Sequence, residues 1–132
     1  MIKEKLKSIK KRELLGFLVG GSTAVAVDYS TYYLLMYVGL PISLSKAISY
    51  VLGAAVGFVI NKYWAFESKR FSVKEIVRYI ILYAISALAN TITNSLVLVI
   101  ISWKLFAFLC ATGVSTIINF LGQKFFVFKN KE

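Results

Sequence analysis

Two short stretches of this sequence carry similar residues in the same order. Residues 61–66 read NKYWAF, and residues 123–128, 62 positions further along, read QKFFVF. Each stretch contains an amide, a lysine and three aromatic residues, and each closes a long apolar run. Two equivalent ends at a fixed separation predict that the chain is built from two equivalent units.

The repeat extends beyond these stretches when each residue is compared with the one 62 positions later. Asp28 corresponds to Asn90, and Asn61 corresponds to Gln123. The identical pairs are Glu13/Glu75, Thr31/Thr93, Leu34/Leu96, Phe58/Phe120, Lys62/Lys124, Phe66/Phe128 and Lys69/Lys131. We therefore expect two copies of one helical hairpin, arranged as a parallel repeat like those of some transporters.

The composition is typical of a membrane protein. Hydrophobic residues make up 58% of the chain, and no charge occurs between Tyr79 and Trp103. A helix needs about 20 apolar residues to cross a bilayer, and long unbroken runs favour helices over the alternating pattern of a barrel. We predict one all-α transmembrane domain over residues 1–132, with a basic juxtamembrane segment at 1–13. Its four predicted spans cover about 14–37, 43–63, 79–102 and 105–125.

The basic residues are distributed unevenly between the two predicted sides of the membrane. Of 16 Lys and Arg residues, only Lys46 and Lys104 lie away from the side of the two termini. The positive-inside rule therefore predicts that both termini are cytoplasmic. Cations that flank spans also attract anionic phospholipids, so the net charge of +10 does not indicate a nucleic-acid partner.

Few side chains are suited to catalysis. The chain has no histidine, and its one cysteine, Cys110, lies inside the fourth predicted span. Without imidazole, an accessible thiol or an acidic cluster, little remains for chemistry or for metal binding. We therefore expect a protein that is not an enzyme and that has no metal or cofactor.

Polar residues inside the predicted spans are the candidates for function. Asp28 lies in the first span, roughly 20 Å from its cytoplasmic edge. A carboxylate at such depth costs about 2.5–3.5 kcal/mol on insertion scales, and such residues usually mark function. The alternative is a structural role, with a protonated Asp28 bonded to Asn90 or Asn94. Asn90, Asn94 and Asn119 are candidates either for helix–helix hydrogen bonds or for function. The aromatic residues at the span ends, more often interface anchors than ligand contacts, are Trp64, Phe66, Phe126 and Phe128.

With these features the sequence resembles the GtrA-like family of small four-span membrane proteins, which are associated with surface polysaccharide and lipid-linked sugar pathways. The resemblance covers essentially the whole chain. It rests on Phe17-Leu18-Val19-Gly20, Asp28, Asn61 to Phe66, Asn90, Asn119-Phe120 and Lys124 to Phe128. The family often has arginine after the first amide, and Lys62 keeps that charge but lacks the bidentate fork.

The resemblance implies translocation of a polyprenyl-phosphate-linked sugar across the cytoplasmic membrane for cell-surface polysaccharide glycosylation. A membrane glycosyltransferase would make this lipid, and we expect a homo-oligomer because four spans look too narrow to enclose a sugar. The cations expected to bind the lipid phosphate at headgroup depth are Lys62, Lys124, Arg78 and Arg12. The residues expected to bind the headgroup and sugar are Asn61, Gln123, Asp28, Asn90, Asn94 and Asn119.

Two alternatives of other classes stay open. One is a proton-coupled exporter of small cations of the small multidrug-resistance type, in which Asp28 would bind proton and substrate alternately. Such proteins typically use glutamate there and, where their topology is dual, show little Lys/Arg bias. The other is a membrane scaffold for a glycosyltransferase, which would need the same spans but need not bind lipid.

Overall fold

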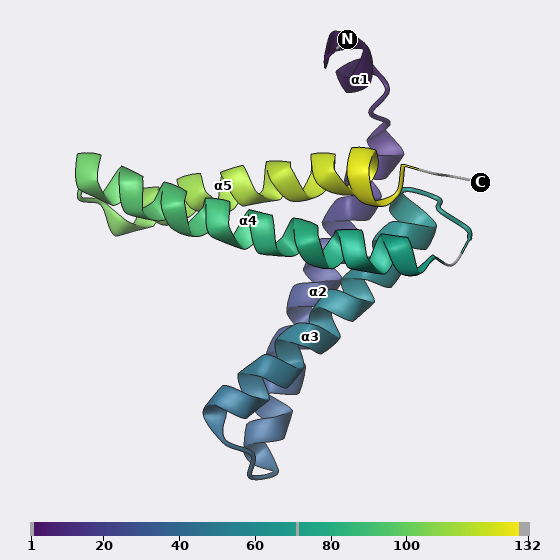
Figure 1. The fold of residues 1–132 in the computed structure, drawn as a ribbon. Coiled ribbons are helices and arrows are strands. Elements are labelled where there is room, and N and C mark those ends of the chain that lie inside the picture. The colour runs from purple at the N-terminus through teal and green to yellow at the C-terminus, as the bar shows by residue number, and fades with distance from the viewer. Residues whose placement is uncertain (1, 71, 130–132) are drawn as a thin grey trace. The chain divides into compact units, whose positions relative to one another are not determined.

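All regular elements are helices in the part of the chain that the structure describes. The structure, a computed structural model, describes residues 2–70 and 72–129 and contains no strand in these ranges (Figure 1). The elements are α1 (Ile2–Lys7), α2 (Lys11–Tyr37), α3 (Ile42–Ile60), η1 (Asn61–Ala65), α4 (Val73–Ile100), α5 (Lys104–Gly122) and η2 (Gln123–Val127). The prediction of an all-α fold is confirmed.

The helices form two compact units, Met1–Lys69 and Arg70–Glu132. In the first unit, α2 and α3 pair as an antiparallel hairpin that η1 extends; in the second, α4, α5 and η2 do the same (Figure 1). The elements of the second unit begin 62 residues after their counterparts, as in Lys11 and Val73, Ile42 and Lys104, and Asn61 and Gln123. The offset of the sequence repeat is therefore also the offset of the helix boundaries. Lys131, the predicted counterpart of Lys69, lies outside the described residues.

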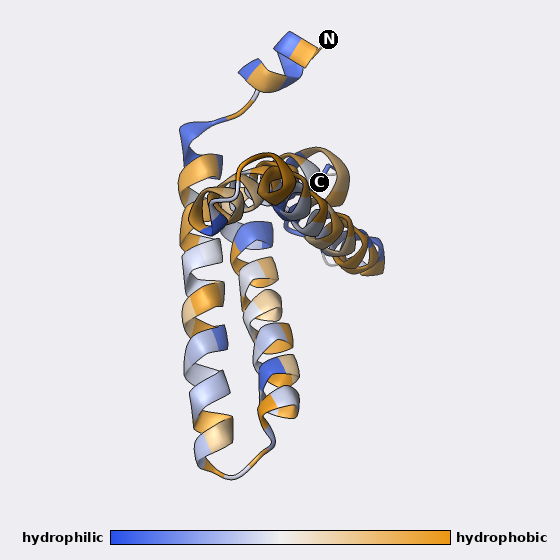
Figure 2. Ribbon diagram, turned by 90° about the vertical axis from the view of Figure 1, so that its left-hand side faces the viewer, coloured by the Kyte–Doolittle hydropathy of each residue, from blue (hydrophilic) through white to orange (hydrophobic). Residues whose placement is uncertain are grey.

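Among the described residues, three helical segments are long and apolar enough to cross a membrane, namely Ile42–Ala65, Val73–Ile100 and Lys104–Val127. The 27-residue α2 is not among them. It is the least hydrophobic of the four long helices, and Figure 2 shows pale and blue residues interspersed with orange ones along it. The chain is thus a multi-pass membrane protein in which α2 is the most polar of the long helices.

The third predicted span, about 79–102, coincides with most of α4, which covers Val73–Ile100. The backbone becomes extended at Ile101 (φ −128°, ψ 109°). The predicted basic segment 1–13 is divided between two helices, since Lys10 is extended (φ −99°, ψ 147°) and separates α1 from α2.

Small residues bring the paired helices close together within each hairpin. A Cβ added to Gly16 would lie 2.7 Å from Ala65 Cα, and one added to Gly53 would lie 3.1 Å from Asp28 Cβ. In the second hairpin, Ala107 of α5 is completely buried. Close backbone approach through small residues is the usual way in which membrane helices associate.

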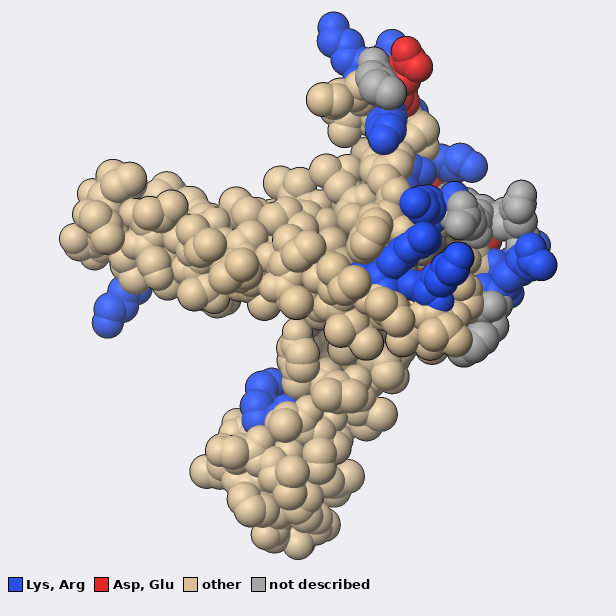
Figure 3. All heavy atoms as spheres, in the orientation of Figure 1, with Lys and Arg blue, Asp and Glu red and all other residues tan. Residues whose placement is uncertain are grey.

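The outward faces of both hairpins are apolar. Large hydrophobic side chains that are more than half exposed occur on every long helix, for example Val25, Val51, Leu88 and Phe108. A helix that presents such residues around its outer surface suits lipid better than water. Figure 3 shows that these flanks are almost free of charge and that most Lys and Arg side chains gather at the end of each hairpin opposite its connecting loop.

Candidate functional site

Both hairpins end in a single π-helical turn. The Phe66 N–H donates to the Asn61 carbonyl oxygen at 2.9 Å, and the Phe128 N–H donates to that of Gln123 at 2.8 Å. These bonds join residues five apart, whereas an α-helix joins residues four apart. Asn61 and Gln123 are themselves buried, with 3% and 0% of their surface exposed. Single π turns are frequent at functional sites, which makes these two turns candidates.

The lysines of the two turns are buried as well. Lys62 is 1% exposed, and its Nζ donates to Ser68 Oγ at 3.2 Å and lies 5.1 Å from the Tyr63 ring centroid. Lys124 is 8% exposed, with Nζ 5.5 Å from the Phe125 ring centroid. The two lysines that the sequence predicts to bind a lipid phosphate at headgroup depth are therefore buried within their own hairpins. Each π turn folds its lysine back against the hairpin, where a ligand reaches it only after a change in structure.

Buried acids lie on the helices that pack against these turns. Glu13 of α2 is 2% exposed and Glu75 of α4 is 5% exposed. α2 packs against η1 in the first hairpin, as α4 packs against η2 in the second. Burying a lone charge is strongly unfavourable, whereas burying opposite charges together is tolerated. The end of each hairpin thus contains one buried acid and one buried base at matching positions.

Two arginines of the predicted phosphate-binding set are more accessible than these lysines. Arg12 Nη2 lies 2.6 Å from Glu67 Oε2 and donates to the Trp64 carbonyl oxygen at 2.8 Å. The hydrogen bond from Arg12 lowers the pKa of the Glu67 carboxyl, and it raises the pKa of the Arg12 guanidinium. Arg78 is half-buried, with its guanidinium carbon 5.7 Å from the Phe126 ring centroid.

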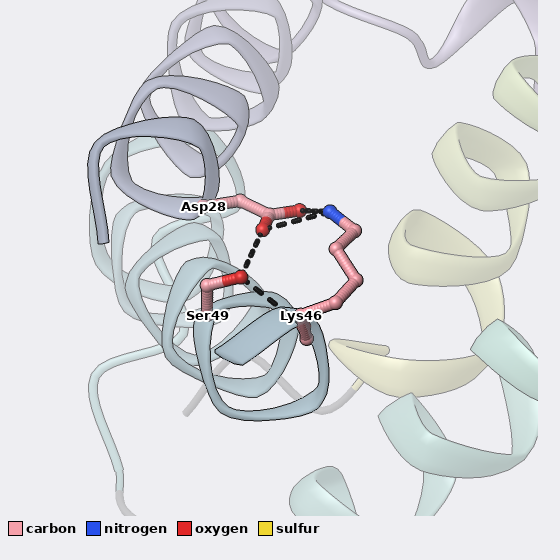
Figure 4. Close-up of polar contacts among 3 residues, drawn as sticks. All are labelled: Asp28, Lys46 and Ser49. Carbon is pink, nitrogen blue, oxygen red and sulfur yellow. Dashed lines mark hydrogen bonds and ion pairs between the residues drawn. The ribbon is translucent and has the colours of Figure 1, made fainter. Parts of the chain in front are cut away.

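Asp28 is held by two residues of its own hairpin. Its carboxylate oxygens accept hydrogen bonds from Lys46 Nζ at 2.9 and 2.8 Å, and Oδ1 also accepts one from Ser49 Oγ at 2.7 Å (Figure 4). Within its own hairpin, Asp28 is thus an ion-paired carboxylate. A carboxylate that exchanges protons and cations would first have to release Lys46.

Lys46 and Ser49 are candidate functional residues that the sequence reading misses. In the sequence, Lys46 is one of two basic residues predicted to lie on the far side of the membrane. The predicted hairpin could have indicated this contact, because residues at similar distances from the connecting loop lie side by side in antiparallel helices. α2 ends at Tyr37 and α3 begins at Ile42, which places Asp28 near Ser49.

The corresponding polar residues of the second hairpin form a neutral set. Asn90 Nδ2 donates to Ser115 Oγ at 3.1 Å, and Ser86 Oγ donates to the Ser115 carbonyl oxygen, also at 3.1 Å. Asn94 is partly exposed. Asn119 Oδ1 is buried and accepts no hydrogen bond within residues 2–70 and 72–129. The structure therefore gives Asn90 a helix–helix hydrogen bond and leaves an acceptor of Asn119 unused.

The two hairpins together correspond to a known domain. A family model described as GtrA/DPMS, transmembrane domain, matches residues 16–128. The chain belongs to this family. The resemblance to the GtrA-like family is thereby confirmed, and the match includes α2 from Gly16 onwards together with both π turns. Membership of the GtrA/DPMS family fits a membrane role in the handling of lipid-linked sugars.

The aromatic residues of this GtrA/DPMS domain fall into two classes. Phe66 and Phe128 are completely buried, so they are core residues and not interface anchors or ligand contacts as expected. They are buried because each π turn directs its closing phenylalanine into the hairpin. Trp64 and Phe126 are 45% and 37% exposed. These two remain available at the surface, close to Arg12 and Arg78 respectively.

Proposed function

We propose that this protein moves a polyprenyl-phosphate-linked sugar from the cytoplasmic to the outer leaflet of the cytoplasmic membrane, for cell-surface polysaccharide glycosylation. The observation that carries the proposal is the match to the GtrA/DPMS transmembrane domain over both hairpins. A carrier of an anionic amphiphile needs cations at the membrane surface and polar groups within its spans. Both kinds of group are present in the described residues.

In this proposal α2 is a fourth span and both termini are cytoplasmic. A helix of 27 residues is about 40 Å long, which exceeds the roughly 30 Å of a hydrocarbon core. The ion pair with Lys46 compensates the charge of Asp28 within α2. Tyr33 and Tyr37 are exposed near the loop end of α2, and Trp64 is exposed at the opposite end of the hairpin. Aromatic residues at two such levels are typical of membrane interfaces.

We assign the first contact with the lipid phosphate to Arg12 and Arg78. Guanidinium groups bind phosphate oxygens through charge-assisted hydrogen bonds, and Arg can do so in a bidentate way. In the first hairpin Lys62 and Asn61, and in the second Lys124 and Gln123, would contact a phosphate only when the π turn of that hairpin opens, because all four side chains are buried. Trp64 and Phe126 would then lie beside the headgroup.

The sugar would meet polar groups within the spans after this first contact. Each hairpin supplies its own set: the Asp28 pair in the first, and Asn90, Asn94 and Asn119 in the second. The unused Oδ1 of Asn119 could accept a hydrogen bond from a sugar hydroxyl. The protein would work without a cofactor or catalysis of its own, as a homo-oligomer, beside anionic phospholipids and a membrane glycosyltransferase.

The test is transport in reconstituted vesicles. Purified full-length protein is incorporated into liposomes with a fluorescent polyprenyl-phosphate sugar, and the fraction of lipid that an impermeant quencher reaches is followed in time. We expect faster translocation than in empty liposomes, and a loss of about tenfold for Arg12→Gln combined with Arg78→Gln, the effect of losing a charge-assisted hydrogen bond.

Two matched variants distinguish the loss of Arg12 and Arg78 from a change in charge elsewhere near them. Glu67→Gln removes the anionic partner of Arg12 but keeps the Arg12 cation, and Lys74→Gln removes an exposed cation near Arg78. Both should transport normally. A wild-type protein that leaves the lipid distribution unchanged while it binds a glycosyltransferase would instead support the scaffold function and refute translocation.

A further inference from the structure

The ammonium group of Lys46 points in a direction that is unusual for a lysine near the end of a membrane helix. Lys46 lies in the second turn of α3, close to the connecting loop. Such lysines normally extend their ammonium group towards the membrane surface. Side chains of a helix also lean towards its N-terminus, which for α3 is the loop end. Here the ammonium group instead contacts Asp28 (Figure 4).

The depth of Asp28 follows from its neighbours on α3. Its carboxylate binds Ser49, nearly one turn further along α3 than Lys46, and its Cβ faces Gly53, about two turns further. Seven residues of a helix correspond to about 10 Å. Lys46 therefore reaches towards the middle of the hairpin, away from the surface at its own end.

Three features allow this ammonium group to change partner. The Lys46 side chain is 55% exposed, whereas that of Asp28 is 18% exposed, so Lys46 can withdraw without displacing neighbours. Ser49 is fully buried, and its Oγ donates to Asp28 Oδ1 at 2.7 Å, with the Lys46 backbone carbonyl oxygen as a second acceptor at 3.1 Å; neither contact involves the Lys46 ammonium group. Tyr32 lies one helical turn from Asp28 on the loop side, with its ring centroid 5.6 Å from Lys46 Nζ. Its ring face can stabilise the cation on an outward path.

The second hairpin indicates that this ion pair is not needed for the fold. The positions that correspond to Asp28, Lys46 and Ser49 carry Asn90, Phe108 and Ala111. Helices α4 and α5 nevertheless pair along their length, with boundaries that match those of α2 and α3 at the offset of 62 residues. A charged pair that only one of two matched hairpins carries points to a specific role.

We propose that Lys46 is a phosphate-binding residue at the loop end of the first hairpin, and that Asp28 holds it inward until the phosphate of an anionic lipid arrives. The ammonium group then exchanges a carboxylate for a phosphate, so it keeps an anionic partner throughout. The phosphate belongs either to the sugar lipid or to a phospholipid headgroup. The inference rests on the proposed membrane topology, and for the sugar lipid it also rests on the proposed function.

Equilibrium binding to the full-length protein in detergent micelles tests this inference. The probes are a short-chain polyprenyl phosphate and a phosphatidylglycerol, with a diacylglycerol as the phosphate-free control. A ligand shifts an equilibrium only by its different affinity for the two states. Asp28→Asn removes the inward anion and should therefore tighten phosphate-lipid binding, by about three- to tenfold. Adding Lys46→Met should abolish that gain, and diacylglycerol binding should not change.

The two probes identify the source of the phosphate. If Asp28→Asn increases the affinity for polyprenyl phosphate alone, the phosphate belongs to the sugar lipid. If it increases the affinity for both probes equally, Lys46 binds any anionic headgroup. The inference is overturned if Asp28→Asn binds no tighter than wild type, or if the gain persists without Lys46. Lys104→Met, which removes an exposed lysine next to the other loop, is the matched control and should leave the gain intact.

A second variant keeps both charges and so avoids a folding defect from an unpaired lysine. Ser49→Ala leaves Asp28 dependent on Lys46 alone, so the ammonium group should be held inward more strongly and phosphate lipids should bind more weakly. Unchanged or tighter binding would contradict the exchange. Binding through Lys46 without transport in vesicles would refute translocation and leave this inference standing.

Discussion

Leu82 packs directly onto Gly122, so that a Cβ added to Gly122 would lie 2.8 Å from Leu82 Cδ2. The corresponding residues of the first hairpin are Gly20 and Ile60, and there a Cβ added to Gly20 would lie 3.3 Å from Ile60 Cγ2. At these positions each hairpin pairs one glycine with one large aliphatic side chain, and the glycine lies on opposite helices; in the first hairpin the Asn61 side chain lies still closer to Gly20 than Ile60 does.

We therefore expect that, in the second hairpin, the glycine and the large aliphatic side chain can be exchanged between α5 and α4. Gly122→Ile should destabilise the second hairpin by about 1–3 kcal/mol, because overpacking displaces the paired helices. Combining it with Leu82→Gly should restore part of that loss, since the pair then resembles Gly20 and Ile60. Thermal unfolding in detergent measures both variants. A double variant no more stable than Gly122→Ile would contradict the exchange.

Gly113→Ala provides the control for this series. A Cβ at Gly113 would meet no atom within 4 Å. The alanine should stabilise α5 by roughly 0.5–1 kcal/mol through its better helix propensity.

The hydrogen bond between Asn90 and Ser115 should contribute modestly to the pairing of α4 and α5. Hydrogen bonds between membrane helices average about 0.6 kcal/mol in double-mutant cycles. Asn90→Ala, Ser115→Ala and their combination should give a coupling energy of about that size in unfolding experiments. Thr91→Ala is the control, because its hydroxyl bonds within its own helix, to the Ala87 carbonyl oxygen. A coupling energy near zero would show that this bond does not stabilise the hairpin.

Glu13 and Lys62 should depend on each other energetically. Both are almost completely buried, on elements that pack together. Removing one charge of a buried pair typically costs about 3–5 kcal/mol, whereas removing both costs much less. Lys62→Met should therefore lower the unfolding temperature strongly, and Glu13→Leu should rescue part of the loss. Lys69→Met is the control, since Lys69 is exposed and its loss should change stability by no more than about 0.5 kcal/mol. Additive effects of the two buried substitutions would show that these charges are independent.

The contact between Arg12 and Glu67 should break in acid. The hydrogen bond from Arg12 lowers the pKa of the Glu67 carboxyl, so the contact is fully present above the unfolded pKa of a glutamate, about 4.3. It is lost as the pH falls through the lower pKa of the folded state. The Arg12 guanidinium stays charged throughout this window, because arginine is not deprotonated in proteins.

The fluorescence of Trp64 reports this transition, because Arg12 also binds the Trp64 carbonyl oxygen. The chain has two tryptophans, so Trp103→Phe leaves Trp64 as the single probe. We expect a titration below about pH 4.3 that Glu67→Gln removes. A titration that persists in Glu67→Gln would assign it to another carboxyl group.

Only part of the fold and of the candidate site could be predicted from sequence patterns. The repeat, the helices and the apolar flanks could be predicted because each depends on residue type and spacing along the chain. The burial of Lys62, Lys124, Phe66 and Phe128 could not, since aromatic and basic residues at the end of a span usually face the interface. These four residues lie in or directly after a π turn, whose hydrogen bonds join residues five apart and so change which side chains face the hairpin.

Amino-acid type and order alone determined that this chain is helical, that it belongs in a membrane and that its second half repeats the first with an offset of 62 residues. These properties follow from hydrophobicity and charge, which act locally. Only the tertiary structure decided which polar groups meet: that Lys46 binds Asp28 and that Lys62 is buried. Such contacts depend on how two helices face each other, and a shift by one residue along either helix rotates a side chain by about 100°.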